Sequence, residues 1–71
     1  MIQPKLMPGD FCSVIKDEVD AGLVVRSGTI VRLMRREIPP NVSPEPYWVC
    51  ENALRIHHIF ESNLRREITQ I

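Results

Sequence analysis

The stretch Trp48–Ile68, WVCENALRIHHIFESNLRREI, decides the fold because its apolar residues fit two different periodicities. Read as a strand, every second residue from Leu54 to Phe60, with His58 among them, falls on one face. Read as a helix capped by Asn52, the apolar residues at positions 53, 56, 60, 64 and 68 form a stripe at helical spacing. We favour the strand and a mainly β fold. The periodicity leaves open an α+β alternative with a C-terminal helix over residues 53–67.

The segments before this stretch are rich in β-forming residues. Strands are predicted at residues 10–15, 28–37 and 47–51, and the strand interpretation above adds residues 54–59. Turns are predicted at Pro8-Gly9-Asp10 and at Ser27-Gly28. Residues 16–20, KDEVD, are predicted to form a polar break between strands. The proline-rich residues 39–46 are predicted to form an exposed loop, because proline cannot enter the interior of a ladder or a helix.

Length and composition limit the functional classes that the chain can belong to. The chain has 71 residues, which predicts a single domain over residues 1–71. A composition of 44% hydrophobic and 25% charged residues is typical of an ordinary globular domain. Nine basic and nine acidic residues give zero net charge, which argues against a general polyanion binder. No apolar run approaches the ~18 residues of a membrane span, so we expect a cytoplasmic protein with free thiols and no membrane contact.

Four segments in chain order, PGDFCSVIKD, SGTIVRLMR, PYWVCE and IFESNLRREI, carry a resemblance to a known group of proteins. Their order resembles small bacterial and phage-type proteins with an SH3-like barrel. The resemblance implies a mainly β barrel with a short 3-10 turn at Ser62-Asn63-Leu64 before a last strand over residues 65–68. Serine and asparagine suit such a turn because their side chains bond to nearby backbone groups.

The first two of these segments are also similar to the KOW element of ribosomal and transcription-factor barrels. KOW loops are usually short and lysine-rich, whereas the connecting loop here, KDEVDAGLVVRS, is long and mostly acidic or apolar. That departure argues against nucleic-acid contact by this loop. The residues that match the element are Gly9, Asp10, Cys12, Val14, Gly28 and Ile30, with Cys12 and Val14 in the two valine places.

The two cysteines and two histidines, Cys12, Cys50, His57 and His58, are the only soft-metal ligands in the chain. No Cys-x-x-Cys or His-x-x-x-His pair is present, and adjacent histidines on a strand point to opposite faces. Strand register places each cysteine on an apolar face, so both are predicted to be core side chains. His58 is predicted to be partly buried and His57 to face solvent. A buried thiol does not suit a nucleophile, and we expect no catalytic residue, metal or cofactor.

The chain has one basic cluster, which lies on its longest predicted strand. Arginines on a strand with a tyrosine nearby could hold a nucleic-acid backbone and stack one base. The favoured interpretation is a solvated face whose arginines pair across the sheet with the glutamates at positions 37, 45 and 51. The candidate binding face consists of Arg26, Arg32, Arg35, Arg36 and Tyr47.

These observations together favour a non-catalytic small β-barrel module with a protein-interaction or accessory role and an unknown protein partner. The alternative is a KOW-like module that binds nucleic acid. A proline-peptide groove of the usual kind needs several exposed aromatic residues. The chain has one Tyr and one Trp, which argues against it.

Overall fold

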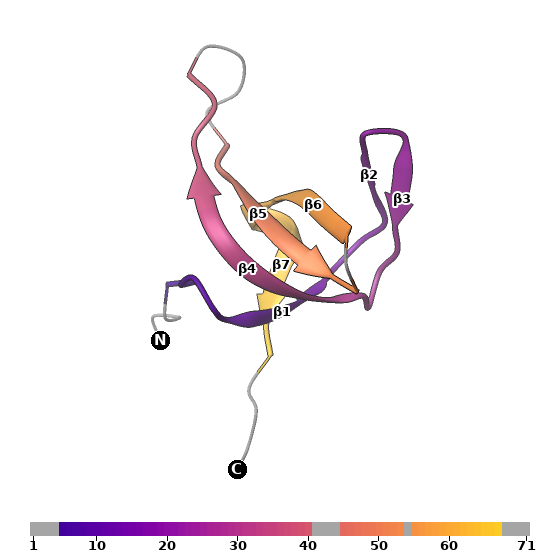
Figure 1. The fold of residues 1–71 in the computed structure, drawn as a ribbon, viewed down its shortest axis with the longest axis horizontal. Helices are drawn as coiled ribbons and strands as arrows, with labels where there is room; N and C mark the ends of the chain where they lie inside the picture. The colour runs from indigo at the N-terminus through magenta and orange to yellow at the C-terminus, as the bar shows by residue number, and fades with distance from the viewer. Residues whose placement is uncertain (1–4, 41–44, 54, 68–71) are drawn as a thin grey trace.

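The structure is mainly β, with seven short strands and one turn of 3-10 helix among the described residues (Figure 1). The computed structural model describes residues 5–40, 45–53 and 55–67. The predicted fold class is confirmed, and the helix over residues 53–67 is wrong. The elements are β1 (Phe11–Val14), β2 (Glu18–Asp20), β3 (Leu23–Val25), β4 (Ile30–Glu37), β5 (Tyr47–Asn52), β6 (Arg55–Phe60), η1 (Glu61–Asn63) and β7 (Leu64–Arg66).

The four strands predicted from β-forming residues correspond to β1, β4, β5 and β6, with ends that differ by at most two residues. The predicted 3-10 turn lies one residue earlier in the structure, and β7 likewise begins one residue before the predicted last strand. The predictions for Leu54, Ile68 and residues 41–44 of the proline-rich loop lie outside the described residues.

The predicted polar break at residues 16–20 is wrong, because part of it is strand β2, which pairs with β3 as a separate hairpin. The turn of this hairpin is Ala21-Gly22, with φ angles of 51° and 83°. Two consecutive positive φ angles match the right-handed twist of the paired strands, and glycine adopts such an angle without strain. Because two of the three residues of β2 are acidic, the pattern of β-forming residues did not indicate a strand here.

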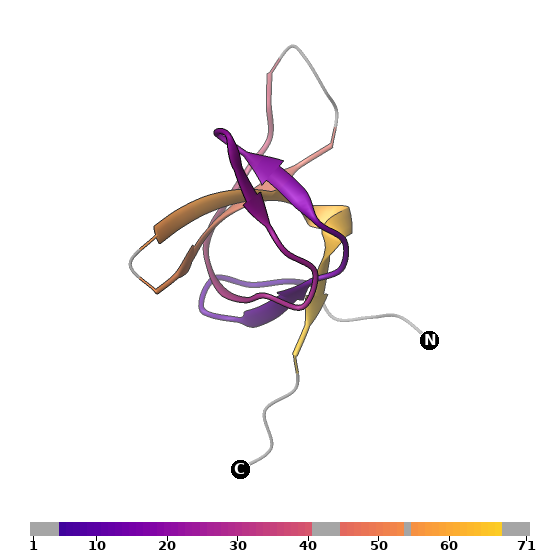
Figure 2. The ribbon, with the colours of Figure 1, turned by 90° about the vertical axis from the view of Figure 1, so that its right-hand side faces the viewer.

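The remaining five strands form one antiparallel sheet in the order β6-β5-β4-β1-β7. These strands curve around a common interior, as Figure 2 shows. The end strands β6 and β7 are not paired with each other, and the hairpin β2–β3 belongs to a second sheet. The closed barrel that the sequence predicted is therefore not formed.

Carboxylate side chains of β2 cover the outer edge of β6, where a closed barrel would have a backbone ladder. The His58 backbone N–H donates to Asp20 Oδ2 at 3.1 Å, and the Phe60 N–H donates to Glu18 Oε2 at 3.1 Å. The second oxygen of Glu18 accepts from Asn63 Nδ2 at 2.9 Å. An uncovered edge strand leaves its N–H groups free to pair with another chain, and here side chains satisfy two of them.

The core is a single cluster between the curved sheet and the hairpin. The largest fully buried side chains, Trp48, Leu33 and Ile59, come from adjacent strands of the sheet. A bulge between Leu33 and Arg35 shifts the register of β4 against β5. The buried cluster consists of Cys12, Val14, Val25, Val31, Leu33, Trp48, Cys50, Ile59 and Leu64.

Candidate functional site

The two thiols lie inside the core, as the sequence predicted, and both side chains are fully buried. Burial raises the pKa of Cys12 to about 11, with the nearby Asp10 carboxylate as a smaller cause. Burial likewise raises the pKa of Cys50 to about 12. A nucleophilic cysteine needs a lowered pKa and partial exposure to solvent, so neither thiol is arranged for catalysis. Among residues 5–40, 45–53 and 55–67, no group of three or more metal-ligating side chains is close enough to hold an ion.

The histidines lie in the opposite arrangement to the predicted one. His57 is opposite the core residue Cys50 and is only 7% exposed, whereas His58 is opposite Val49 and is half exposed. The prediction grouped His58 with the apolar residues Ile56 and Phe60. Those residues are on the outer face of β6, and both remain substantially exposed.

The three arginines of β4 are all neutralised by glutamates. Arg32 Nη1 lies 3.0 Å from Glu51 Oε2, and Arg35 Nε lies 2.7 Å from Glu37 Oε2. The Arg32–Glu51 pair crosses the sheet as predicted, whereas Arg35 and Glu37 lie two residues apart on the same strand. The exposed pairs contribute about 0–1 kcal/mol each to stability, and they leave little positive charge on this strand to attract phosphate.

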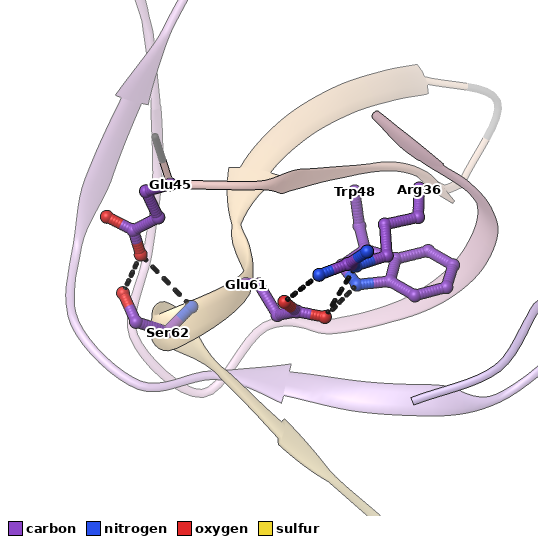
Figure 3. A network of polar contacts seen from close by, with 5 residues as sticks. All are labelled: Arg36, Glu45, Trp48, Glu61 and Ser62. Atoms are coloured by element: carbon purple, nitrogen blue, oxygen red, sulfur yellow. Dashed lines mark hydrogen bonds and ion pairs between the residues drawn. The ribbon is translucent and has the colours of Figure 1, made fainter. Parts of the chain in front are cut away.

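Arg36 belongs to a separate network that reaches the core tryptophan (Figure 3). Its guanidinium binds both oxygens of Glu61 at 3.1 Å, and Trp48 Nε1 donates to Glu61 Oε2 at 3.1 Å. The hydrogen bonds from Arg36 lower the pKa of the Glu61 carboxyl, against an opposing effect of burial, and Trp48 adds to the lowering. The same hydrogen bonds raise the pKa of Arg36. Glu61 was not among the glutamates that the sequence analysis assigned to the β4 arginines.

Glu45 fixes the other side of η1, as Figure 3 also shows, through contacts with the hydroxyl and backbone N–H of Ser62. The Glu61 N–H donates to the carbonyl of Pro46 at 3.0 Å. These contacts connect η1 to the start of β5, together with the network of Arg36, Trp48 and Glu61. This connection, the joint around Glu61, has a structural role, and Glu61 occupies the guanidinium of Arg36.

The predicted binding face does not form one surface. Arg35 and Arg36 are neighbours on a strand and therefore point to opposite sides. Arg26 follows β3 and lines a different cleft, and Tyr47 lies on β5 with its ring edge-to-face against His58, at a centroid distance of 5.6 Å. Tyr47 is the one member of that set that lines the groove described next.

A groove of about 420 Å³ lies between the hairpin and the sheet. Its apolar side chains are exposed, with Val19 at 68% and Phe60 at 42% of their full accessibility. Apolar and aromatic residues dominate the lining, with two carboxylates at the wall that β2 forms. The lining residues are Glu18, Val19, Asp20, Pro39, Tyr47, His58 and Phe60.

The sequence analysis missed most of this groove because it did not find the hairpin that forms one wall. The available signal was Asp20-Ala21-Gly22-Leu23, a short turn flanked by Val19 and Val24. These two valines are directly opposite each other in the hairpin.

Comparisons of the chain with protein-family models, with curated proteins and with solved structures found no match. Within the described residues, no helix has the length and apolar character needed to cross a membrane.

Proposed function

We propose that the chain is a non-catalytic module with an SH3-like order of strands, and that it binds another protein through the groove between β2 and strands β5 and β6. The SH3-like organisation is supported by the hairpin inserted between β1 and β4 and by the 3-10 turn that precedes β7. Two free thiols are typical of a reducing compartment, and this supports a cytoplasmic location.

The observation that carries the proposal is the combination of exposed apolar side chains with carboxylates on one wall of the groove. Val19, Tyr47 and Phe60 offer apolar area that a partner would remove from water, at about 25 cal/mol per Å². Glu18 and Asp20 accept backbone hydrogen bonds from β6 and place two carboxylates in the groove lining. The partner that fits is a protein segment with an apolar side chain for the groove and a neighbouring Lys or Arg for the carboxylates.

The KOW-like alternative, nucleic-acid binding through the β4 arginines, has less support. Arg32, Arg35 and Arg36 each bind a glutamate, so phosphate contact would first require those pairs to break. Their charge is already balanced within the fold.

The test is a selection of displayed random peptides against the folded protein, followed by affinity measurements on the peptides recovered. We expect recovered peptides to share an apolar residue flanked by a basic one. Val19→Ser should weaken their binding roughly tenfold, because the loss of an apolar contact of this size is about 1.4 kcal/mol or more.

Val24→Ser is the matched control, because Val24 is opposite Val19 in the same hairpin, is 53% exposed and lies outside the groove. Binding to this variant should be unchanged. Failure to enrich any peptide, or equal losses in the two variants, would contradict the proposed function.

A further inference from the structure

A second cleft, of about 250 Å³, lies on the β3 side of the hairpin, away from the groove. Its walls come from β3, from the link between β3 and β4, and from the adjoining ends of β5 and β6. Five polar or basic residues line it in addition to the apolar residues of β3. The lining residues are Leu23, Val24, Val25, Arg26, Thr29, Asn52, Arg55 and His57.

The two arginines of this cleft differ from those of the β4 strand because no carboxylate neutralises them. Arg26 and Arg55 form no ion pair with any residue of the described ranges, whereas Arg32, Arg35 and Arg36 do. The lining contains these two guanidiniums and no carboxylate, so the cleft has a local excess of positive charge.

The wall of the cleft also contains a buried polar side chain, His57. Its side chain is 91% buried at the cleft wall, and its Nδ1 atom has no hydrogen-bond partner among the described residues. The nearest carboxylate oxygen, Asp20 Oδ2, is 3.7 Å away and already accepts the His58 backbone N–H. A buried polar atom without a partner is uncommon in folded proteins.

We propose that this cleft binds an oxyanion, a phosphate or carboxylate group, between Arg26 and Arg55. Each guanidinium presents a planar fork of N–H donors that matches two oxygens of such a group. The Thr29 hydroxyl lies in the same lining and can donate a further hydrogen bond. The site lies outside the protein-docking groove and does not depend on it.

The experiment is a titration of the ¹⁵N-labelled protein with inorganic phosphate, followed by amide chemical shifts, with sodium chloride at equal ionic strength as reference. We expect saturable shifts at Arg26, Thr29 and Arg55 that chloride does not reproduce. The double variant Arg26→Gln, Arg55→Gln should bind phosphate at least roughly tenfold more weakly, because it removes the charge-assisted hydrogen bonds of both guanidiniums.

Arg65→Gln is the matched control, since Arg65 is also exposed and without an ion pair in the described structure, and it lies on β7 outside the cleft. Binding to this variant should be unchanged, and Arg26→Gln alone provides a milder test should the double variant unfold. A parallel titration with acetate shows whether the bound group is a carboxylate or specifically a phosphate. Shifts that chloride reproduces, or that survive in the double variant, would overturn the proposal.

Discussion

At the scale of single residues, burial determines the chemistry of the two cysteines. Cys12 and Cys50 are fully buried in the core, and the pKa of each thiol is raised, to about 11 and about 12. Both effects suppress the thiolate, which is the reactive form. Strand register was enough to predict this burial because each cysteine shares a strand face with a core residue, Cys12 with Val14 and Cys50 with Trp48.

Alkylation by a thiol reagent at pH 8 should therefore be slow in the native protein and fast in denaturant. The raised pKa alone lowers the thiolate fraction about 100-fold for Cys12, because two pKa units separate its folded value from that of an ordinary thiol, and burial slows the reaction further. Mass spectrometry of the time course measures both sites. Rapid native labelling of both cysteines would show that they are accessible, in conflict with the described core.

At the scale of elements, the hairpin β2–β3 is attached to the sheet by side chains. Asp20 and Glu18 each accept a backbone N–H of β6, at positions 58 and 60. Sequence patterns cannot show such a role, because an acidic residue in a short exposed segment is usually solvated. The acidic residues that seemed to interrupt the β pattern are the ones that dock the hairpin.

Removing either carboxylate should release the amide that it holds. Asp20→Ala is expected to speed hydrogen exchange at the His58 amide, and Glu18→Ala at the Phe60 amide. Each change should cost about 1–3 kcal/mol, since a donor loses its partner. Amide exchange followed by NMR measures the effect, and each variant serves as the control for the other. Exchange that rises equally at both amides in each variant would indicate general loosening instead of specific capping.

At the scale of the whole molecule, the strands could be predicted from local patterns and their assembly could not. Alternation and turn residues locate β1, β4, β5 and β6, because these strands pair with neighbours in a curved sheet around one core. The groove and the second cleft depend on where the hairpin docks, which is set by contacts between residues about 40 positions apart in sequence. The assignment of Arg36 to Glu61 has the same non-local origin.

The joint around Glu61 connects three parts of the chain, β4, β5 and η1, and it makes the stability of the whole molecule sensitive to acid. The pKa of Glu61 is lowered mainly by hydrogen bonds from Arg36. A carboxyl group with a lowered pKa stabilises the folded state above the ordinary glutamate pKa of about 4.3, and this contribution is lost as the pH falls through the folded value. Glu61→Gln should thus lower the melting temperature at pH 7, by roughly 5 °C if the loss is about 1 kcal/mol. The difference from the unmodified protein should shrink steadily below about pH 4.

Glu51→Gln, which removes only the exposed pair with Arg32, is the control and should have a smaller effect at pH 7. Thermal melts followed by circular dichroism at each pH provide the measurement. A Glu61→Gln difference that persists unchanged into strong acid would mean that the carboxylate charge is not what stabilises this joint.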